Sequence, residues 1–189
     1  MRRSRLTRPQ RTPIFIGCEG QSEMGYAGWL RNLVLDRGLP FHLELYDLGR
    51  GAGDPLARID MAIARLKHLE RSREPFARRY VFLDTDQLAA DAGRANQARY
   101  RAADHDIVVI WQEPTHEAFL LRHLPGCDMH RPPDKRRADQ ALEKKWSSYH
   151  KPTTAEEIER RLDLNGAYRV AAHLPELANL LRKIGLLLE

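Results

Sequence analysis

The sequence predicts an α/β protein: a parallel sheet of about four strands flanked by helices, with a helical C-terminal extension. Two observations predict this class. Short runs that are apolar on both faces recur along the chain, as the covered strands of a parallel sheet require. Segments with apolar residues at spacings of three and four lie between these runs, which gives the strand and helix alternation of a doubly wound sheet.

Four segments are predicted as strands. Three of them are short apolar runs suited to the covered middle of the sheet, at residues 14–18, 80–83 and 107–111. In the fourth, Phe41, Leu43 and Leu45 alternate with more polar residues. This period of two indicates a half-buried strand nearer a sheet edge.

The helices are predicted from their apolar stripes and their ends. The first runs from Ser22, a candidate N-cap, to a stop before Gly38. The second begins at Asp54, whose carboxylate can cap free amides while Pro55 fits the first turn. Further helices are predicted at residues 116–124, 155–164 and 168–188, and the polar, proline-containing segment 125–135 is predicted as a loop.

One domain of ordinary size accounts for the 189 residues, which are 42% hydrophobic and 30% charged. We expect a flexible basic arm at residues 1–12, an α/β body at 13–124 and a helical extension at 125–189 packed on the same domain. The formal net charge is +5, and the arm alone carries five arginines and no acid. Such an arm either binds phosphates or acts as a solubilising terminus.

Several classes of protein are excluded by what the sequence lacks. No apolar run is long enough for a secretory leader or a membrane span, so we expect a cytoplasmic protein with no membrane partner. Cys18 and Cys127 are too few for a disulfide framework or a cysteine-rich zinc site. Asp54 stands where a dinucleotide fingerprint needs its third glycine, and no Gly-Lys-Ser/Thr occurs for a P-loop.

Carboxylates follow the predicted strands at their carboxyl ends. Glu19 follows the first strand, Asp84 and Asp86 the third, and Glu113 the fourth. Ligands of open parallel sheets bind outside these strand ends. Two aspartates two residues apart in an extended segment point the same way, and crowded carboxylates repel unless a cation or a proton neutralises them. Oxygen ligands favour Mg²⁺ or Mn²⁺, although acids at strand ends also serve as turn residues and helix caps.

Together these residues resemble a Toprim domain, and more narrowly the RloB family of proteins associated with restriction-modification loci and phage defence. The motifs that carry the resemblance are Glu19-Gly20-x-x-Glu23, Gly51-x-Gly53-Asp54-Pro55, Asp84-x-Asp86, Glu113-Pro114-x-x-Glu117 and Tyr149-x-Lys151. They occur in this order over residues 13–151. Glu117 precedes Phe119 by two residues, which departs from the family's pattern.

The resemblance implies an acidic Mg²⁺ or Mn²⁺ centre like that of topoisomerases, primases and OLD-type nucleases, and hence a nuclease that hydrolyses DNA or RNA in a restriction or phage-defence context. The metal ligands expected from it are Glu19, Asp84, Asp86 and Glu117, and the catalytic residues are Glu19, Glu23 and Lys151. Candidate nucleic-acid contacts are Arg136, Arg137, Lys144 and Lys145, for which a solvated helix face is the alternative interpretation. A defence-system ATPase or restriction-modification proteins are further expected partners.

Two other function classes stay open. A phosphohydrolase of the haloacid dehalogenase type also uses Asp-x-Asp at a strand end, but there the pair follows the first strand of the fold, whereas here it follows the third. The other class is a non-catalytic defence accessory that binds nucleic acid or a partner and whose acidic site is degenerate.

Overall fold

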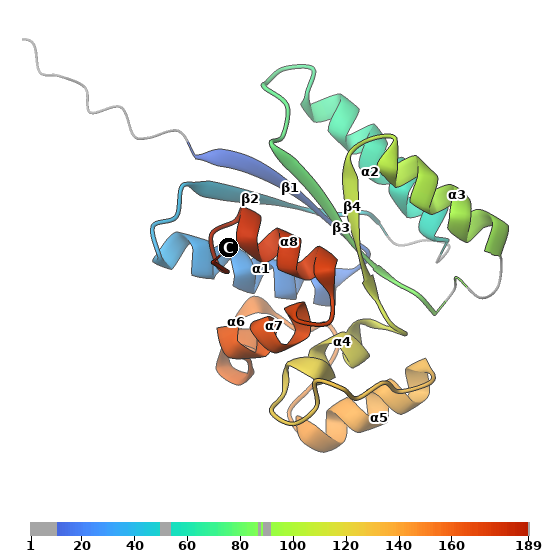
Figure 1. The fold of residues 1–189 in the computed structure, drawn as a ribbon, viewed down its shortest axis with the longest axis vertical. Coiled ribbons are helices and arrows are strands. Elements are labelled where there is room, and N and C mark those ends of the chain that lie inside the picture. The colour runs from blue at the N-terminus through green and yellow to red at the C-terminus, as the bar shows by residue number, and fades with distance from the viewer. Residues whose placement is uncertain (1–10, 50–53, 87, 89–91, 189) are drawn as a thin grey trace, which may run out of the picture.

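A parallel four-stranded sheet forms the centre of the computed structural model, which describes residues 11–49, 54–86, 88 and 92–188 (Figure 1). The strand order is β2-β1-β3-β4. The strands are β1 (Thr12–Cys18), β2 (Phe41–Asp47), β3 (Arg78–Asp84) and β4 (Ile107–Gln112). The predicted class is confirmed, and the alternating strand β2 lies at a sheet edge as expected.

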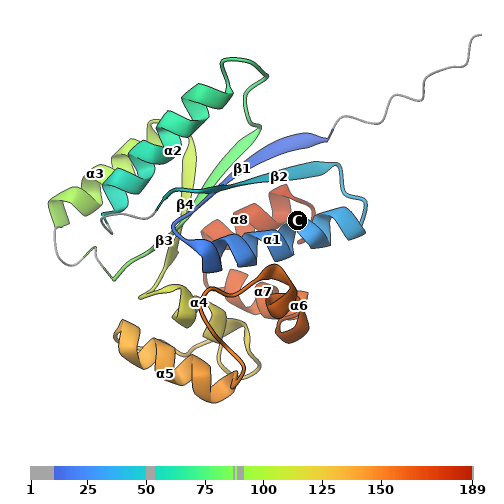
Figure 2. The same ribbon diagram turned by 180° about the vertical axis from the view of Figure 1, so that it is seen from behind.

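Helices cover both faces of the sheet (Figures 1 and 2). One face is covered by α1 (Gln21–Asp36) and α8 (Pro175–Lys183), the other by α2 (Pro55–Leu69) and α3 (Ala92–Ala103). Because successive side chains of a strand point to opposite faces, Ile14 and Ile16 join the buried cluster on the α1 side, while Phe15 joins the cluster on the α2 side.

The C-terminal helices pack around the end of β4 and against α1. They comprise α4 (His116–His123), α5 (Lys135–Lys145), α6 (Ala155–Arg161) and α7 (Leu164–Ala171). Both α5 and α7 contact α4, α6 contacts α1, and α8 contacts β4. The predicted loop at residues 125–135 is confirmed up to Asp134, since α5 begins at Lys135.

Two of the predicted helices have different bounds. The helix expected at 168–188 is two helices. Pro175 lacks the backbone N–H that a continuation of α7 would need as a hydrogen-bond donor, and it is the first residue of α8. The helix expected at 155–164 ends at Arg161, and the carboxylate of Asp163 accepts a hydrogen bond from the Gly166 amide to cap α7.

The two predicted N-caps have opposite outcomes. Asp54 caps α2 by accepting a hydrogen bond from the Leu56 amide at 3.0 Å, as predicted. Ser22 does not cap α1, because that helix begins at Gln21 and Gly20 occupies the N-cap position. The Ser22 hydroxyl instead accepts a hydrogen bond from the Thr153 amide at 3.3 Å.

The contact between α1 and the loop at Thr153 is very close. A Cβ at Gly25 would overlap the carbonyl oxygen of Thr153, so only glycine allows this approach. The loop that carries residue 151 is thereby fixed against the first turns of α1.

The predicted basic arm lies mostly outside the described residues, which begin at Arg11. Strand β1 begins at Thr12, two residues earlier than the apolar run indicated, and the Thr12 amide donates to the Pro40 carbonyl at 2.9 Å. Within the described ranges, no helix combines the length and the apolar character needed to cross a bilayer.

Candidate functional site

Two of the predicted acids meet at the carboxyl ends of neighbouring strands. Glu19 directly follows β1, and Asp84 is the last residue of β3, which pairs with β1. The Asp84 amide donates a hydrogen bond to Oε2 of Glu19 at 3.1 Å. Glu23, in the first turn of α1, is only 6% exposed. The expected convergence of the first and third strand ends is therefore present.

Asp84 is the most strongly perturbed acid of this group. Its Oδ1 is buried and has no hydrogen-bond partner among the described residues. Burial, and then the charges of Glu23, Glu19, Glu117 and Asp86, raise the pKa of Asp84 to about 9. The carboxyl is consequently protonated at neutral pH unless a cation compensates the surrounding charge.

The pKa of Glu19 is also raised. Its burial is the largest cause, and the charges of Glu23 and Asp86 act in the same direction. The hydrogen bond from the Asp84 amide and the charge of Arg58 oppose these effects without cancelling them. Glu19 and Asp84 thus share one electrostatic environment that disfavours two negative charges.

Asp84 and Glu23 line a pocket of ≈ 340 Å³. Its wall also contains His116 and Glu117 from the start of α4, and two cationic side chains, Lys135 and Lys151. Acids from the end of β3 and from α1 and α4 therefore share its wall with two lysines of the C-terminal segment. A pocket with this charge distribution suits a phosphate group that is bound together with a cation.

Glu117 is already paired on one side of the pocket. It is buried, with its Oε1 2.7 Å from Nζ of Lys151 and 3.0 Å from the donating hydroxyl of Tyr149. Burial alone would raise the pKa of Glu117, but the hydrogen bond and charge of Lys151, with the charge of His116, lower it to about 2. Glu117 is therefore a charged partner of Lys151.

Lys151 bridges two acids from different helices. Its Nζ contacts Glu117 of α4 at 2.7 Å and Asp139 of α5 at 3.0 Å. Burial lowers the pKa of Lys151, but the hydrogen bonds and charges of these two carboxylates raise it above its ordinary value. The lysine stays protonated and ties the loop at residue 151 to the pocket.

His116 is a buried pocket residue that the sequence did not single out for function. Its Nδ1 lies 2.7 Å from Nε2 of Gln112 and 3.9 Å from Oε1 of Glu23. Its Nε2 is buried and has no partner in the described part of the chain. A histidine at a helix start gives no signal of this in sequence, because the contact with Glu23 joins residues far apart in the chain.

The remaining predicted residues lie outside the pocket wall. Asp86 is exposed in the turn after β3, so it affects Asp84 and Glu19 through its charge but does not line the pocket. The four basic candidates on α5 are all exposed, while that helix buries Ala138 and Leu142. These four residues are Arg136, Arg137, Lys144 and Lys145.

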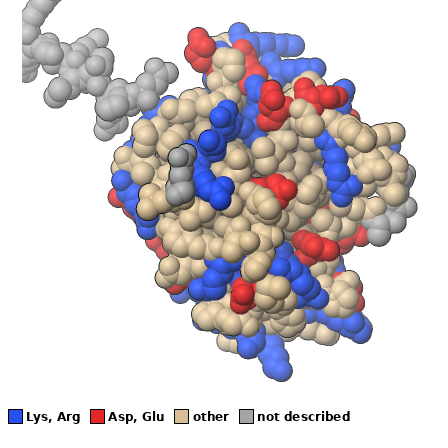
Figure 3. All heavy atoms as spheres, in the orientation of Figure 1, with Lys and Arg blue, Asp and Glu red and all other residues tan. Residues whose placement is uncertain are grey.

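Charge on the surface is mixed. Lys and Arg are interspersed with Asp and Glu over the face seen in Figure 3, with no single basic patch on it.

Of the glycine motif before α2, Gly51 and Gly53 lie outside the described residues. Asp54 of that motif pairs with Arg94 of α3, in addition to capping α2.

The ligand geometry of a metal centre is incomplete. Across residues 11–49, 54–86, 88 and 92–188, no three His, Cys, Asp or Glu side chains are arranged so that they could hold a metal ion together. What the described acids provide is oxygen ligand chemistry, an unpaired buried oxygen on Asp84 and mutual repulsion. These features suit a hard divalent cation if the side chains move to close around it.

Comparisons with protein-family models, with curated proteins and with solved structures find no match to this chain.

Proposed function

We propose that this protein is an Mg²⁺- or Mn²⁺-dependent nuclease that hydrolyses phosphodiester bonds. The observation that carries the proposal is the carboxyl of Asp84, which lines a pocket and is surrounded by the charges of four other acids. Its Oδ1 is buried and has no hydrogen-bond partner among the described residues. Leaving an acid in such surroundings is costly for stability. Acids whose pKa is strongly perturbed in this way cluster at functional sites.

Glu19 and Asp84 are the residues that we expect to hold the cation, with Asp86 and Glu117 as further oxygen ligands from the turn after β3 and from α4. Glu23 lies beside them in the first turn of α1. A bound Mg²⁺ would supply Lewis-acid stabilisation of charge on the phosphodiester. The resemblance to Toprim domains, whose parallel sheet this fold matches in class, supports the same choice of ligands.

Lys151 and Lys135 are the residues that we expect to hold the substrate phosphate. Both line the same pocket as Glu23 and Asp84, and Lys151 is kept protonated by Glu117 and Asp139. An incoming phosphate would compete with Glu117 for Lys151. Release of Glu117 from that ion pair would free its carboxylate for the cation.

Nucleic acid is the partner that this chemistry implies, as DNA or RNA. The exposed basic residues of α5 follow directly from the pocket residue Lys135 and would extend the phosphate contacts. A restriction or phage-defence context, with a defence ATPase or restriction-modification proteins as partners, and a cytoplasmic location belong to the same proposal through the RloB resemblance.

The test is a nicking assay on supercoiled DNA and on single-stranded RNA with Mg²⁺ or Mn²⁺. We expect the wild-type protein to cut at least one substrate, and Asp84→Ala to reduce cutting to the level seen with EDTA. Asp104→Ala is the matched control, because Asp104 is an exposed acid before the amino end of β4. Equal activity in the Asp84 and Asp104 variants would exclude this site.

A non-catalytic nucleic-acid-binding protein is the second candidate. It is favoured by the lack, within the described residues, of three side chains grouped to hold a metal. In that case Mg²⁺ should neither bind with saturation nor change the melting temperature, and Asp84→Ala should leave nucleic-acid binding intact. A calorimetric titration with Mg²⁺ distinguishes the two candidates.

A further inference from the structure

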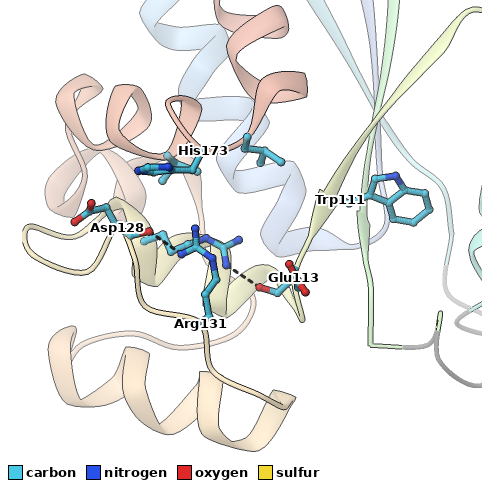
Figure 4. A pocket seen from close by; sticks show the side chains of 8 residues that line it. Trp111, Glu113, Asp128, Arg131 and His173 are labelled. Atoms are coloured by element: carbon cyan, nitrogen blue, oxygen red, sulfur yellow. Dashed lines mark hydrogen bonds between the residues drawn. The ribbon is translucent and has the colours of Figure 1, made fainter.

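A second pocket contains two arginines that form no ion pair with a carboxylate of the described residues. It is formed by the end of β4, by α4, by the loop before α5 and by the turn between α7 and α8 (Figure 4). Arg122 of α4, Arg131 of the loop and His173 of the turn lie in its wall. Three groups that carry or can accept positive charge thus come from segments far apart in the sequence.

Arg122 is buried, at 5% exposure. Its Nη1 donates to the backbone carbonyl of Glu113 at 2.7 Å, and it forms no ion pair with any described carboxylate. A guanidinium has five N–H donors, and this one contact uses only part of that capacity. Burial, and then the nearby charge of Arg131, lower the pKa of Arg122 to about 10.

Arg131, like Arg122, donates its hydrogen bonds to backbone carbonyl oxygens. Its Nη1 donates to the backbone carbonyls of Asp128 at 2.7 Å and of His130 at 3.3 Å. The side chain is exposed and forms no ion pair in the described part of the chain. Figure 4 shows Arg131 between Asp128 and Glu113, with His173 across the pocket.

The two carboxylates beside the pocket do not neutralise the arginines. Glu113 and Asp128 both line it, but each accepts from an arginine through its backbone oxygen and not through its carboxylate. The charge of Glu113 only partly opposes the lowering of the Arg122 pKa. The remaining donors of the two guanidinium groups are therefore available for an anion.

The volume of the pocket limits the size of that anion. It is ≈ 60 Å³, which is room for a few water molecules or one small anion such as phosphate, since roughly 10–15 Å³ is enough to hold one water.

We propose that this pocket binds a phosphate group, held by the guanidinium groups of Arg122 and Arg131 with His173 beside them. The phosphate belongs either to free inorganic phosphate or to the terminal phosphate of a nucleic-acid strand. The proposal does not depend on the acidic pocket having nuclease activity.

The experiment is a calorimetric titration of the full chain with inorganic phosphate, with ionic strength held constant by sodium chloride. We expect saturable binding at one site in the wild-type protein. Arg131→Gln should weaken it about tenfold or more, since a charge-assisted hydrogen bond is lost. Because Arg131 is exposed, Arg131→Gln should keep the wild-type melting temperature. Arg122→Lys is a second variant, which keeps the positive charge but lacks the planar guanidinium group.

Arg78→Gln is the matched control. Arg78 is also exposed and also donates to a backbone carbonyl, that of Ala77 at 2.9 Å, but it lies at the amino end of β3. The control should bind phosphate as the wild type does. Absence of saturable binding in the wild type, or equal weakening by Arg131→Gln and Arg78→Gln, would overturn the proposal.

Competition identifies the source of the phosphate. A 5′-phosphorylated oligonucleotide and its 5′-hydroxyl counterpart are each added before the phosphate titration. Displacement by the phosphorylated strand alone assigns the pocket to a strand terminus. Displacement by neither strand, with saturable binding of inorganic phosphate, assigns it to free phosphate.

Discussion

Replacing Asp84 with asparagine should stabilise the metal-free protein. Asparagine has nearly the shape of aspartate but carries no charge, so Asp84→Asn removes one acid from the group around Glu19 and Glu23 without leaving a cavity. Its amide also offers donors to the neighbouring carboxylates. We therefore expect Asp84→Asn to gain stability and, under the proposed function, to lose activity.

The size of the gain follows from the pKa of Asp84, which is raised to about 9 in the native state and is about 3.9 in an unfolded chain. Below about pH 4 both states are protonated and the group has no effect on stability. As the pH rises from about 4 towards 9, only the unfolded state loses its proton, and the native state is destabilised by about 1.4 kcal/mol per pH unit. At pH 7 the penalty reaches about 4 kcal/mol, which Asp84→Asn should relieve in large part.

The assay is urea unfolding at pH 5, 6, 7 and 8 in EDTA, for the wild type, Asp84→Asn and Asp104→Asn. The free energy of unfolding of the Asp84 variant should exceed that of the wild type, and the difference should widen as the pH rises. The Asp104 variant should follow the wild type. A difference that is absent at pH 7, or that does not change with pH, would refute the crowding of acids around Asp84.

Three further predictions test other contacts. Gly25→Ala should destabilise the protein by about 2 kcal/mol or more in urea unfolding, because its methyl group overlaps the Thr153 carbonyl; a stability equal to wild type would contradict this close approach. Burial lowers the pKa of His123 to about 3, so stability should fall by about 1.4 kcal/mol per pH unit as the pH drops from about 6.5 towards 3, and His123→Gln should remove that part of the slope. Lys151→Met should cost about 1–2 kcal/mol, because it leaves the buried Glu117 carboxylate without its cation, and the double variant with Glu117→Gln should recover most of the loss in the same assay.

The sheet could be predicted because its strands satisfy a simple requirement. A strand covered on both faces must be apolar on both, and β1, β3 and β4 show this in sequence. The C-terminal helices were harder to delimit, because apolar spacing continues from α7 into α8. Only Pro175 indicates the break, and a proline is equally compatible with the first turn of a new helix.

The candidate site was predictable only as far as the strands extend. Glu19 and Asp84 meet because they end neighbouring parallel strands, which follows from the sequence pattern and the sheet rules. The expectation that Asp84 and Asp86 point the same way assumed an extended chain, but β3 ends at Asp84 and a turn follows. The ion pair of Glu117 with Lys151 depends on a long-range packing contact that no local pattern indicates.

The cover of the sheet by α8 affects how the chain is made. Leu177 and Leu181 of α8 lie in the same buried cluster as Ile14 and Ile16 of β1. Until the ribosome has synthesised α8 and released it from the exit tunnel, this face of the sheet lacks part of its cover. The nascent chain therefore exposes apolar surface until α8 is in place, and fragments that stop before residue 175 should aggregate when expressed alone.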